Sequence, residues 1–112
     1  MNDAPSSPPL TPAVFHILLA LAHGEKHGYE ITKAVRRDSN GKVTMGNGTL
    51  YGSLKRMLGD GLIEIVADRV DDSDTDTRRK YYGLTDLGRA ALNAELQRYI
   101  DTTAVIHRYG LV

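Results

Sequence analysis

The chain has 112 residues, with 14 basic side chains balancing 14 acidic ones, four histidines and no cysteine. This length suits a single domain, and the lack of cysteine excludes disulfides and thiol catalysis and fits a reducing cytoplasm. No apolar run approaches the roughly 20 residues that cross a bilayer, and the start of the chain lacks the basic and apolar regions of a signal peptide, so we expect no membrane association.

The N-terminal part is expected to be a disordered tail followed by an apolar helix. Residues 1–9 are rich in Pro and Ser, a composition typical of disorder. Thr11 and Pro12 then supply an N-cap hydroxyl and a proline at the first helical position. They predict a helix that extends to about Ala22 and ends at Gly24. Nearly every side of this helix is apolar, so we expect burial both in its own subunit and against a partner.

Two further helices are predicted before residue 61. One is expected over residues 28–38, where Ser-Asn-Gly at 39–41 ends it. The other is expected over residues 49–60, because apolar residues recur there at i, i+4, i+7 and i+8, on one face of a helix. These apolar residues are Leu50, Leu54, Met57 and Leu58.

The opposite face of the 49–60 helix is small and basic. It consists of Gly48, Gly52, Lys55, Arg56 and Gly59, with Tyr51 at its edge. No acidic residue occurs between positions 42 and 59. We expect Asn47 to cap this helix, which leaves Thr49 free for a groove or a phosphate. A helix of this kind, entered through a glycine turn, suits close approach to a phosphate backbone and therefore indicates DNA binding.

Two short strands and a fourth helix are predicted next. Residues 63–69 and 80–84 are rich in Ile, Val and Tyr, and the segment 70–77 between them consists largely of Asp, Ser and Thr, which favour a turn. Aspartates crowd this turn, while Arg78, Arg79 and Lys80 make the returning strand basic. Thr85 is expected to cap a helix that extends to about residue 107.

The fourth helix carries a seam typical of a coiled coil. Apolar and small residues recur along it at alternating spacings of four and three, namely Leu92, Leu96, Tyr99, Thr103 and Ile106. This pattern favours a homodimer, although the seam could also pack on its own domain. The expected fold class is mainly α with a small β-wing: a winged helix-turn-helix domain over residues 10–84 and a C-terminal dimerisation helix over residues 85–112.

Several short blocks occur in the order found in a known family. They are Ile17-Leu18-Leu19-Ala20-Leu21, His27-Gly28-Tyr29-Glu30-Ile31, Gly48-Thr49-Leu50-Tyr51, Asp60-Gly61-Leu62-Ile63, Arg78-Arg79-Lys80-Tyr81-Tyr82, and Leu84-Thr85 through Gly88-Arg89. Together they resemble the PadR family of transcriptional regulators. The resemblance implies a cytoplasmic homodimer that acts as a repressor on a pseudo-palindromic double-stranded operator. It also implies relief by a small-molecule effector.

The candidate site residues fall into two groups. The expected DNA-binding residues are Asn47, Gly48, Thr49, Tyr51, Ser53, Lys55, Arg78, Arg79, Lys80, His27 and Tyr29. The expected dimer-interface residues are Phe15, Leu92, Leu96, Tyr99, Thr103 and Ile106. The resemblance implies that the effector binds in a cleft near Phe15 and Tyr99, on the first and fourth helices. Tyr51 has two interpretations: a DNA contact, or a cover for the edge of the core with its hydroxyl in water.

Other functions have weaker support in the sequence. Gly24 interrupts the helix between His23 and His27, so the two rings need not share a face, and no His-Glu-x-x-His motif occurs. We therefore expect no metal site and no cofactor. No phosphate-loop, dinucleotide or triad motif indicates an enzyme. The alternative is a dimeric winged-helix module that binds proteins and has no DNA target. Zero net charge, Gly52 on the outer face and the acidic turn favour this alternative.

Overall fold

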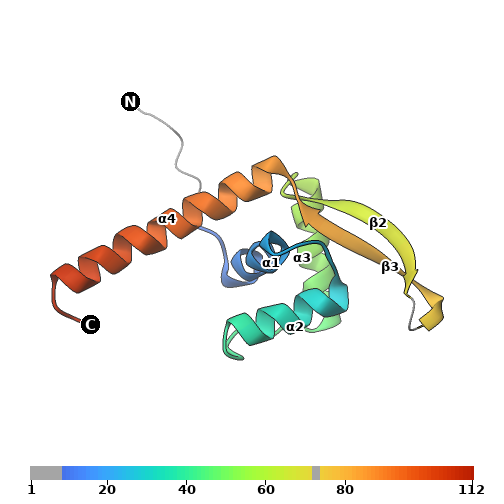
Figure 1. Ribbon diagram of the computed structural model, residues 1–112, viewed down its shortest axis with the longest axis horizontal. Coiled ribbons are helices and arrows are strands. Elements are labelled where there is room, and N and C mark those ends of the chain that lie inside the picture. The colour runs from blue at the N-terminus through green and yellow to red at the C-terminus, as the bar shows by residue number, and fades with distance from the viewer. Residues whose placement is uncertain (1–8, 72–73) are drawn as a thin grey trace.

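The computed structural model describes residues 9–71 and 74–112, with the backbone alone described for residues 69–71 and 74–78. The elements are α1 (Pro12–Ala22), β1 (Lys26–His27), α2 (Gly28–Asp38), α3 (Asn47–Gly59), β2 (Ile63–Asp71), β3 (Asp74–Leu84) and α4 (Asp86–Arg108) (Figure 1). The chain is mostly helical with one three-stranded antiparallel sheet in the order β1-β3-β2. The expected winged helix with a C-terminal helix is therefore confirmed. The predicted tail lies outside the described residues except for Pro9.

Three helices begin at the side-chain caps that their sequences contain. The Thr11 hydroxyl accepts a hydrogen bond from the Val14 N–H at 3.2 Å, and Pro12 follows at the first helical position, as predicted. The Thr85 hydroxyl accepts from the Gly88 N–H at 3.0 Å at the start of α4. In α2 the capping residue is His27, described with the site below. These caps satisfy backbone donors that a helix leaves free at its start.

The start of α3 corrects one expectation. Its N-cap is Gly46, which makes no side-chain hydrogen bond, and Asn47 is already the first helical residue. The helix therefore begins two residues earlier than predicted, and the Asn47 side chain does not cap it. Because no side chain covers the first turn, its N–H groups remain free for water or a ligand. Asn47, Gly48 and Thr49 are all exposed there.

The core lies where α1, α2, α3, the sheet and the first turns of α4 meet. Its buried members are largely apolar and come from every layer: Ile17, Leu18, Leu21, Ile31, Val35, Leu50, Leu54, Met57, Ile63, Tyr82 and Leu92. Leu92 is a correction, because only 2% of it is exposed within its own subunit. It has almost no surface left for a partner and belongs to the core instead of the dimer seam. Leu96 is partly buried against the same core.

The wing strands are longer than predicted. Pairing of β2 with β3 runs from Ile63↔Leu84 to Asp71↔Asp74, with irregularities near residues 66 and 70. Most of the segment 70–77, expected as a turn, is thus strand backbone. A second correction is β1, a two-residue strand that pairs Lys26 with Tyr82 and that no sequence pattern predicted. This pairing holds the start of α2 against the central strand of the wing.

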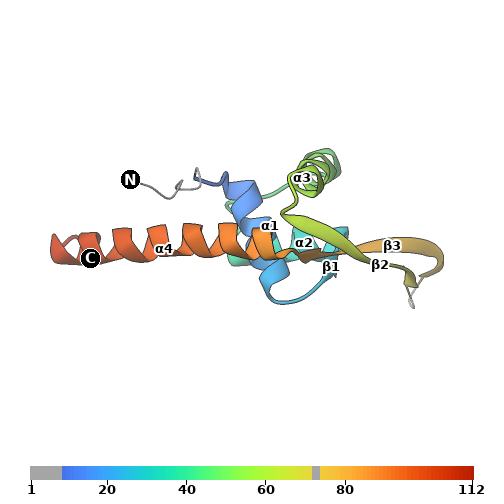
Figure 2. The same cartoon turned by 90° about the horizontal axis from the view of Figure 1, so that it is seen from above.

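The fourth helix extends well beyond the core. Figures 1 and 2 show α4 leaving the helical core on the side opposite the wing, which gives the molecule its long axis. Its first turns are packed, whereas Tyr99 and Ile100 are 51% and 60% exposed. None of the helices in the described part of the chain combines the length and the apolar character that a membrane crossing requires.

Candidate nucleic-acid interface

The outer face of α3 is open to solvent. Gly48, Gly52 and Gly59 have no atom within 4 Å of where a side chain would begin. Lys55 and Arg56 are exposed beside them, and Ser53 is half-buried. The apolar face predicted for the same helix is buried through Leu50, Leu54 and Met57. The helix therefore presents an uncovered surface without acidic side chains, as its sequence indicated.

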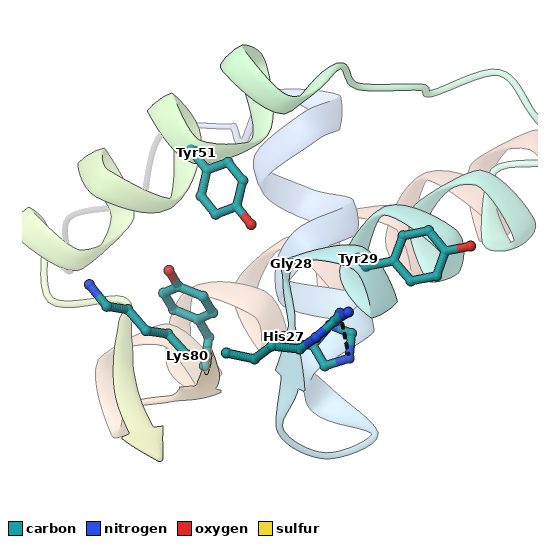
Figure 3. Close-up of a pocket in the computed structure, with 7 residues that line it drawn as sticks. His27, Gly28, Tyr29, Tyr51 and Lys80 are labelled. Carbon is teal, nitrogen blue, oxygen red and sulfur yellow. Dashed lines mark hydrogen bonds between the residues drawn. The ribbon is translucent and has the colours of Figure 1, made fainter. Parts of the chain in front are cut away.

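A pocket of about 400 Å³ adjoins this face. It lies where α3, the start of α2 and β3 meet, and it is lined by His27, Gly28, Tyr29, Tyr51, Arg79, Lys80 and Tyr82. A neighbouring hollow shares several of these residues and adds Thr32, Asn47 and Leu50. The structure thus brings together candidate residues from three separate segments of the sequence. Figure 3 shows Tyr51 directed from α3 toward Gly28, and the Tyr29 ring directed away from it.

Tyr51 lies between the exposed face of α3 and the pocket. It is 52% exposed, yet its hydroxyl lies so close to Gly28 that a Cβ built there would be 2.6 Å from the oxygen. Glycine at position 28 is therefore what admits the tyrosine ring. About half of the side chain thus remains accessible on the surface of α3, while its hydroxyl lies against Gly28 at the pocket.

Tyr82 lines the same pocket as Tyr51. It is 5% exposed, and its hydroxyl has no hydrogen-bond partner among the described residues. Burial raises the pKa of Tyr82 above its ordinary value of 10.0, and the electrostatic effect of Tyr51 raises it further. The hydroxyl therefore stays protonated at neutral pH and can donate a hydrogen bond into the pocket.

His27 has a structural role that limits direct contact with DNA. It is 7% exposed, and its Nδ1 accepts from the Glu30 N–H at 3.4 Å while the Glu30 carboxylate accepts from the His27 N–H at 3.1 Å. This reciprocal pair is a capping box. The guanidinium of Arg79 lies 3.4 Å from both ring nitrogens. The imidazole thus helps to hold Arg79 at the pocket.

The remaining predicted DNA contacts are placed as follows. Lys80 is exposed, whereas Arg79 is half-buried. Tyr29 is 63% exposed, with the Lys33 ammonium 5.3 Å from its ring centre. The side chain of Arg78 and those of the acidic turn, residues 71–76, lie outside the described residues. Basic character at the pocket therefore comes from Arg79 and Lys80.

The predicted dimer residues lie on a different part of the molecule. The rings of Phe15 and Tyr99 pack edge-to-face with centres 5.2 Å apart, which joins α1 to α4. Thr103 is exposed, and its hydroxyl donates to the Tyr99 carbonyl at 2.7 Å. Ile106 is half-buried. Ile100, 60% exposed, is an apolar residue that the seam did not include.

Sequence reasoning missed Gly28 and Tyr82 as site residues. Both lay within the blocks that carried the family resemblance, but neither has a side-chain pattern that distinguishes a pocket lining from a core. Their roles depend on contact between segments more than 20 residues apart in sequence. For metals, the described residues contain no cluster of three His, Cys, Asp or Glu side chains able to hold an ion.

Comparison with known proteins gives consistent matches. The model of the transcriptional regulator PadR-like family matches residues 17–94. A PadR family transcription regulator from Clostridium difficile superposes with a TM-score of 0.70 at 27% identity, covering 88% of this chain and 98% of that one. A transcriptional regulator from Clostridium thermocellum gives 0.65 at 27% identity, covering 87% and 88%.

A third structure contains nucleic acid. Bacillus subtilis PadR in complex with operator DNA superposes with a TM-score of 0.65 at 28% identity. The match covers 74% of this chain and 45% of the Bacillus protein. The family model and these structures describe transcriptional regulators, not enzymes.

Proposed function

This chain belongs to the PadR-like family of transcriptional regulators, and we propose that it is a homodimeric repressor that binds a pseudo-palindromic operator in double-stranded DNA. The observation that carries the proposal is the exposed, acid-free face of α3 beside a pocket that contains Arg79 and Lys80. In this proposal residues 10–84 form the DNA-binding domain, α3 enters a major groove, and the protein acts in the cytoplasm.

The contacts on DNA divide by chemistry. The free N–H groups at the start of α3, together with Thr49 and Lys55, hold phosphates and set the position of the helix. Tyr51 and Ser53 lie where base or sugar contacts are available. Gly52 offers no side chain on this face, so part of the sequence preference comes from DNA shape.

The dimer is proposed from the exposed apolar surface of α4. Tyr99 and Ile100 are each more than half exposed, and they lie in the C-terminal half of α4. Burying them against a second copy removes apolar surface from water, at roughly 25 cal/mol per Å². In a two-fold dimer the two α3 helices meet successive major grooves when they lie about 34 Å apart.

The effector part of the proposal concerns the same region. Phe15 and Tyr99 join α1 to α4, so a small molecule bound beside them in the dimer would alter the angle between these helices. A change in that angle changes the spacing of the two α3 helices, and with it the fit to the operator. Relief of repression follows if the ligand favours the wrong spacing.

DNA binding is tested by sequencing the DNA that co-purifies with the protein, and by gel shift with the DNA upstream of its gene. Lys55→Ala should weaken binding to every sequence alike and reduce the salt slope of log affinity by about 0.9. Tyr51→Ala should also reduce the preference for the operator if the ring touches a base. Wild-type affinity in both variants would exclude α3 as the recognition helix. Dimers that bind no DNA would favour a protein-interaction module instead.

A further inference from the structure

We propose that Thr85 is a positioning residue for DNA binding, because its hydroxyl fixes the end of α3 to the start of α4. The inference rests on the proposed homodimeric function and adds the contact that sets the separation of the two recognition helices. It concerns two blocks of the sequence that make none of the proposed DNA contacts, residues 60–63 and 84–89. These blocks meet at the corner where α3 ends and α4 begins (Figures 1 and 2). Four residues form this α3–α4 joint: Gly61, Leu62, Thr85 and Gly88.

The first half of the joint is the end of α3. Gly61 has a φ of +76°, a left-handed conformation that glycine adopts without strain. Its N–H donates to the Leu58 carbonyl at 3.1 Å, and the Leu62 N–H donates to the Met57 carbonyl at 3.0 Å. These two hydrogen bonds form a Schellman motif, a common way to end a helix. The carbonyl groups of Gly61 and Leu62 are therefore held in place relative to α3.

The second half of the joint is the start of α4, where Thr85 contacts both of these carbonyls. The Thr85 hydroxyl donates to the Gly61 carbonyl. The Thr85 N–H donates to the Leu62 carbonyl at 3.2 Å. The same hydroxyl accepts from the Gly88 N–H at 3.0 Å and so caps α4. A hydroxyl can donate one hydrogen bond and accept others, so this one side chain caps α4 and holds the end of α3 at once.

Gly88 makes the close approach of the two segments possible. A Cβ at this position would overlap the Leu62 carbonyl oxygen, so only glycine lets the first turn of α4 lie directly on the chain that leaves α3. The helices α3 and α4 make little direct contact with each other, although both pack on α1. The joint is therefore the direct link between the helix proposed to read DNA and the helix proposed to form the dimer.

The consequence concerns the spacing of the two α3 helices in the proposed dimer. Each α4 is held against its partner, so the angle at the joint sets where each α3 lies. Two recognition helices fit successive major grooves when they are about 34 Å apart. A rigid joint keeps most dimers at one spacing, whereas a loose joint spreads them over several spacings. The apparent affinity for the operator then falls with the fraction of dimers that have the correct spacing.

The first test varies the hydroxyl and the spacing of the DNA together. The probes are a duplex that the full-length wild type selects from a random pool, the same duplex with one base pair inserted between its half-sites, and a single half-site. The insertion separates the half-sites by about 3.4 Å more and should weaken binding of the wild type. Thr85→Val keeps the shape of the side chain but lacks the hydroxyl. It should bind the selected duplex about tenfold more weakly, the loss expected when roughly one dimer in ten has the correct spacing.

Two ratios distinguish positioning from stability. Thr85→Val should lose less affinity than the wild type on the one-base-pair insertion, and it should bind the single half-site like the wild type. Thr85→Ser is the matched control, because serine keeps the donor and the acceptor, and it should bind all three duplexes like the wild type. A purely structural role would lower the stability of Thr85→Val and leave both ratios unchanged.

Gly88→Ala is a second variant that opens the joint without removing a polar side chain. It should show the same weakened discrimination between the two spacings. All proteins are compared at a temperature at which circular dichroism shows them folded. Thr85→Val and Thr85→Ser decide the outcome by themselves if Gly88→Ala does not fold.

A second measurement needs no DNA. The chain has no cysteine, so Gly48→Cys introduces a single site for a spin label at the start of α3. No atom lies within 4 Å of a side chain that begins there. Double electron–electron resonance then gives the distances between the two labels of a dimer. We expect one narrow peak for the labelled chain, the same peak with Thr85→Ser, and a broader distribution with Thr85→Val.

The outcomes separate the two proposals. If the wild type selects a duplex with two half-sites, while Thr85→Val discriminates between the spacings equally strongly and gives the same narrow peak, the positioning role is excluded and the proposed function stands. If the wild type selects no duplex, or the labelled chain gives no distance between subunits, the proposed homodimeric function fails. In that case the role of Thr85 within it is overturned as well.

Discussion

The packing of Gly88 gives a sharp test of how α4 is joined to the domain. In Gly88→Ala the new Cβ would lie 1.9 Å from the carbonyl oxygen of Leu62 and 2.9 Å from its carbon. An ordinary contact needs about 3.4 Å, so α4 or the loop must move by about 1.5 Å. The Leu62 carbonyl also accepts from the Thr85 N–H at 3.2 Å, and the Leu62 N–H donates to Met57 at 3.0 Å. The loop is therefore held on both sides.

The expected magnitude is a balance of three effects. Overpacking of this kind costs about 3 kcal/mol, and disturbing the Leu62–Thr85 hydrogen bond costs about 1 kcal/mol. Alanine is better than glycine inside a helix by about 1 kcal/mol. Gly88→Ala should therefore lower the free energy of unfolding by about 3 kcal/mol, a large share of the 5–15 kcal/mol typical of a domain.

Gly52→Ala is the matched control, because the same substitution in α3 meets no atom within 4 Å. It should raise the free energy of unfolding by about 1 kcal/mol through helix propensity alone. Both variants and the wild type would be unfolded in urea and followed by circular dichroism. One protein concentration is used throughout, because the stability of the proposed dimer would depend on concentration. A Gly88→Ala protein as stable as the wild type would refute the packing argument.

Three further outcomes are expected. Ile100→Glu places a charge on exposed apolar surface of α4. Light scattering should therefore show monomers, while the circular dichroism spectrum should stay that of the wild type. Dimers that persist in this variant would exclude this surface as the dimer interface. Because the pKa of Tyr82 is raised in the folded chain, the folded state binds that proton more tightly. The contribution of Tyr82 to the free energy of unfolding is therefore complete below pH 10 and declines as the pH rises further. Tyr82→Phe should lack this decline in urea titrations at pH 9 and pH 11. Thr85→Ala removes the acceptor for the Gly88 N–H and the donor to the Gly61 carbonyl. It should lower the free energy of unfolding by about 1 kcal/mol in the same assay. An unchanged free energy of unfolding would mean that water replaces the cap.

The sequence determined the elements whose signals are local. Thr11 and Pro12 predicted the start of α1 because an N-cap and its proline are adjacent in the chain. The spacing of Leu50, Leu54 and Met57 predicted which face of α3 is buried, since helix geometry alone sets which residues share a face. The order of helices, strands and turn then indicated the winged helix. The first two of these predictions depend on residues within a few helical turns of one another.

Tertiary structure decided what depends on contacts between distant segments. The seam on α4 is the same pattern whether it meets a partner or its own domain, and packing placed Leu92 in the core. The two-residue strand β1 has no periodicity to detect and exists because β3 pairs with it. The pocket likewise needs Gly28, Tyr51 and Tyr82 from three elements. A sequence pattern shows which side chains share a face, but the surface against which that face packs is set only when the chain folds.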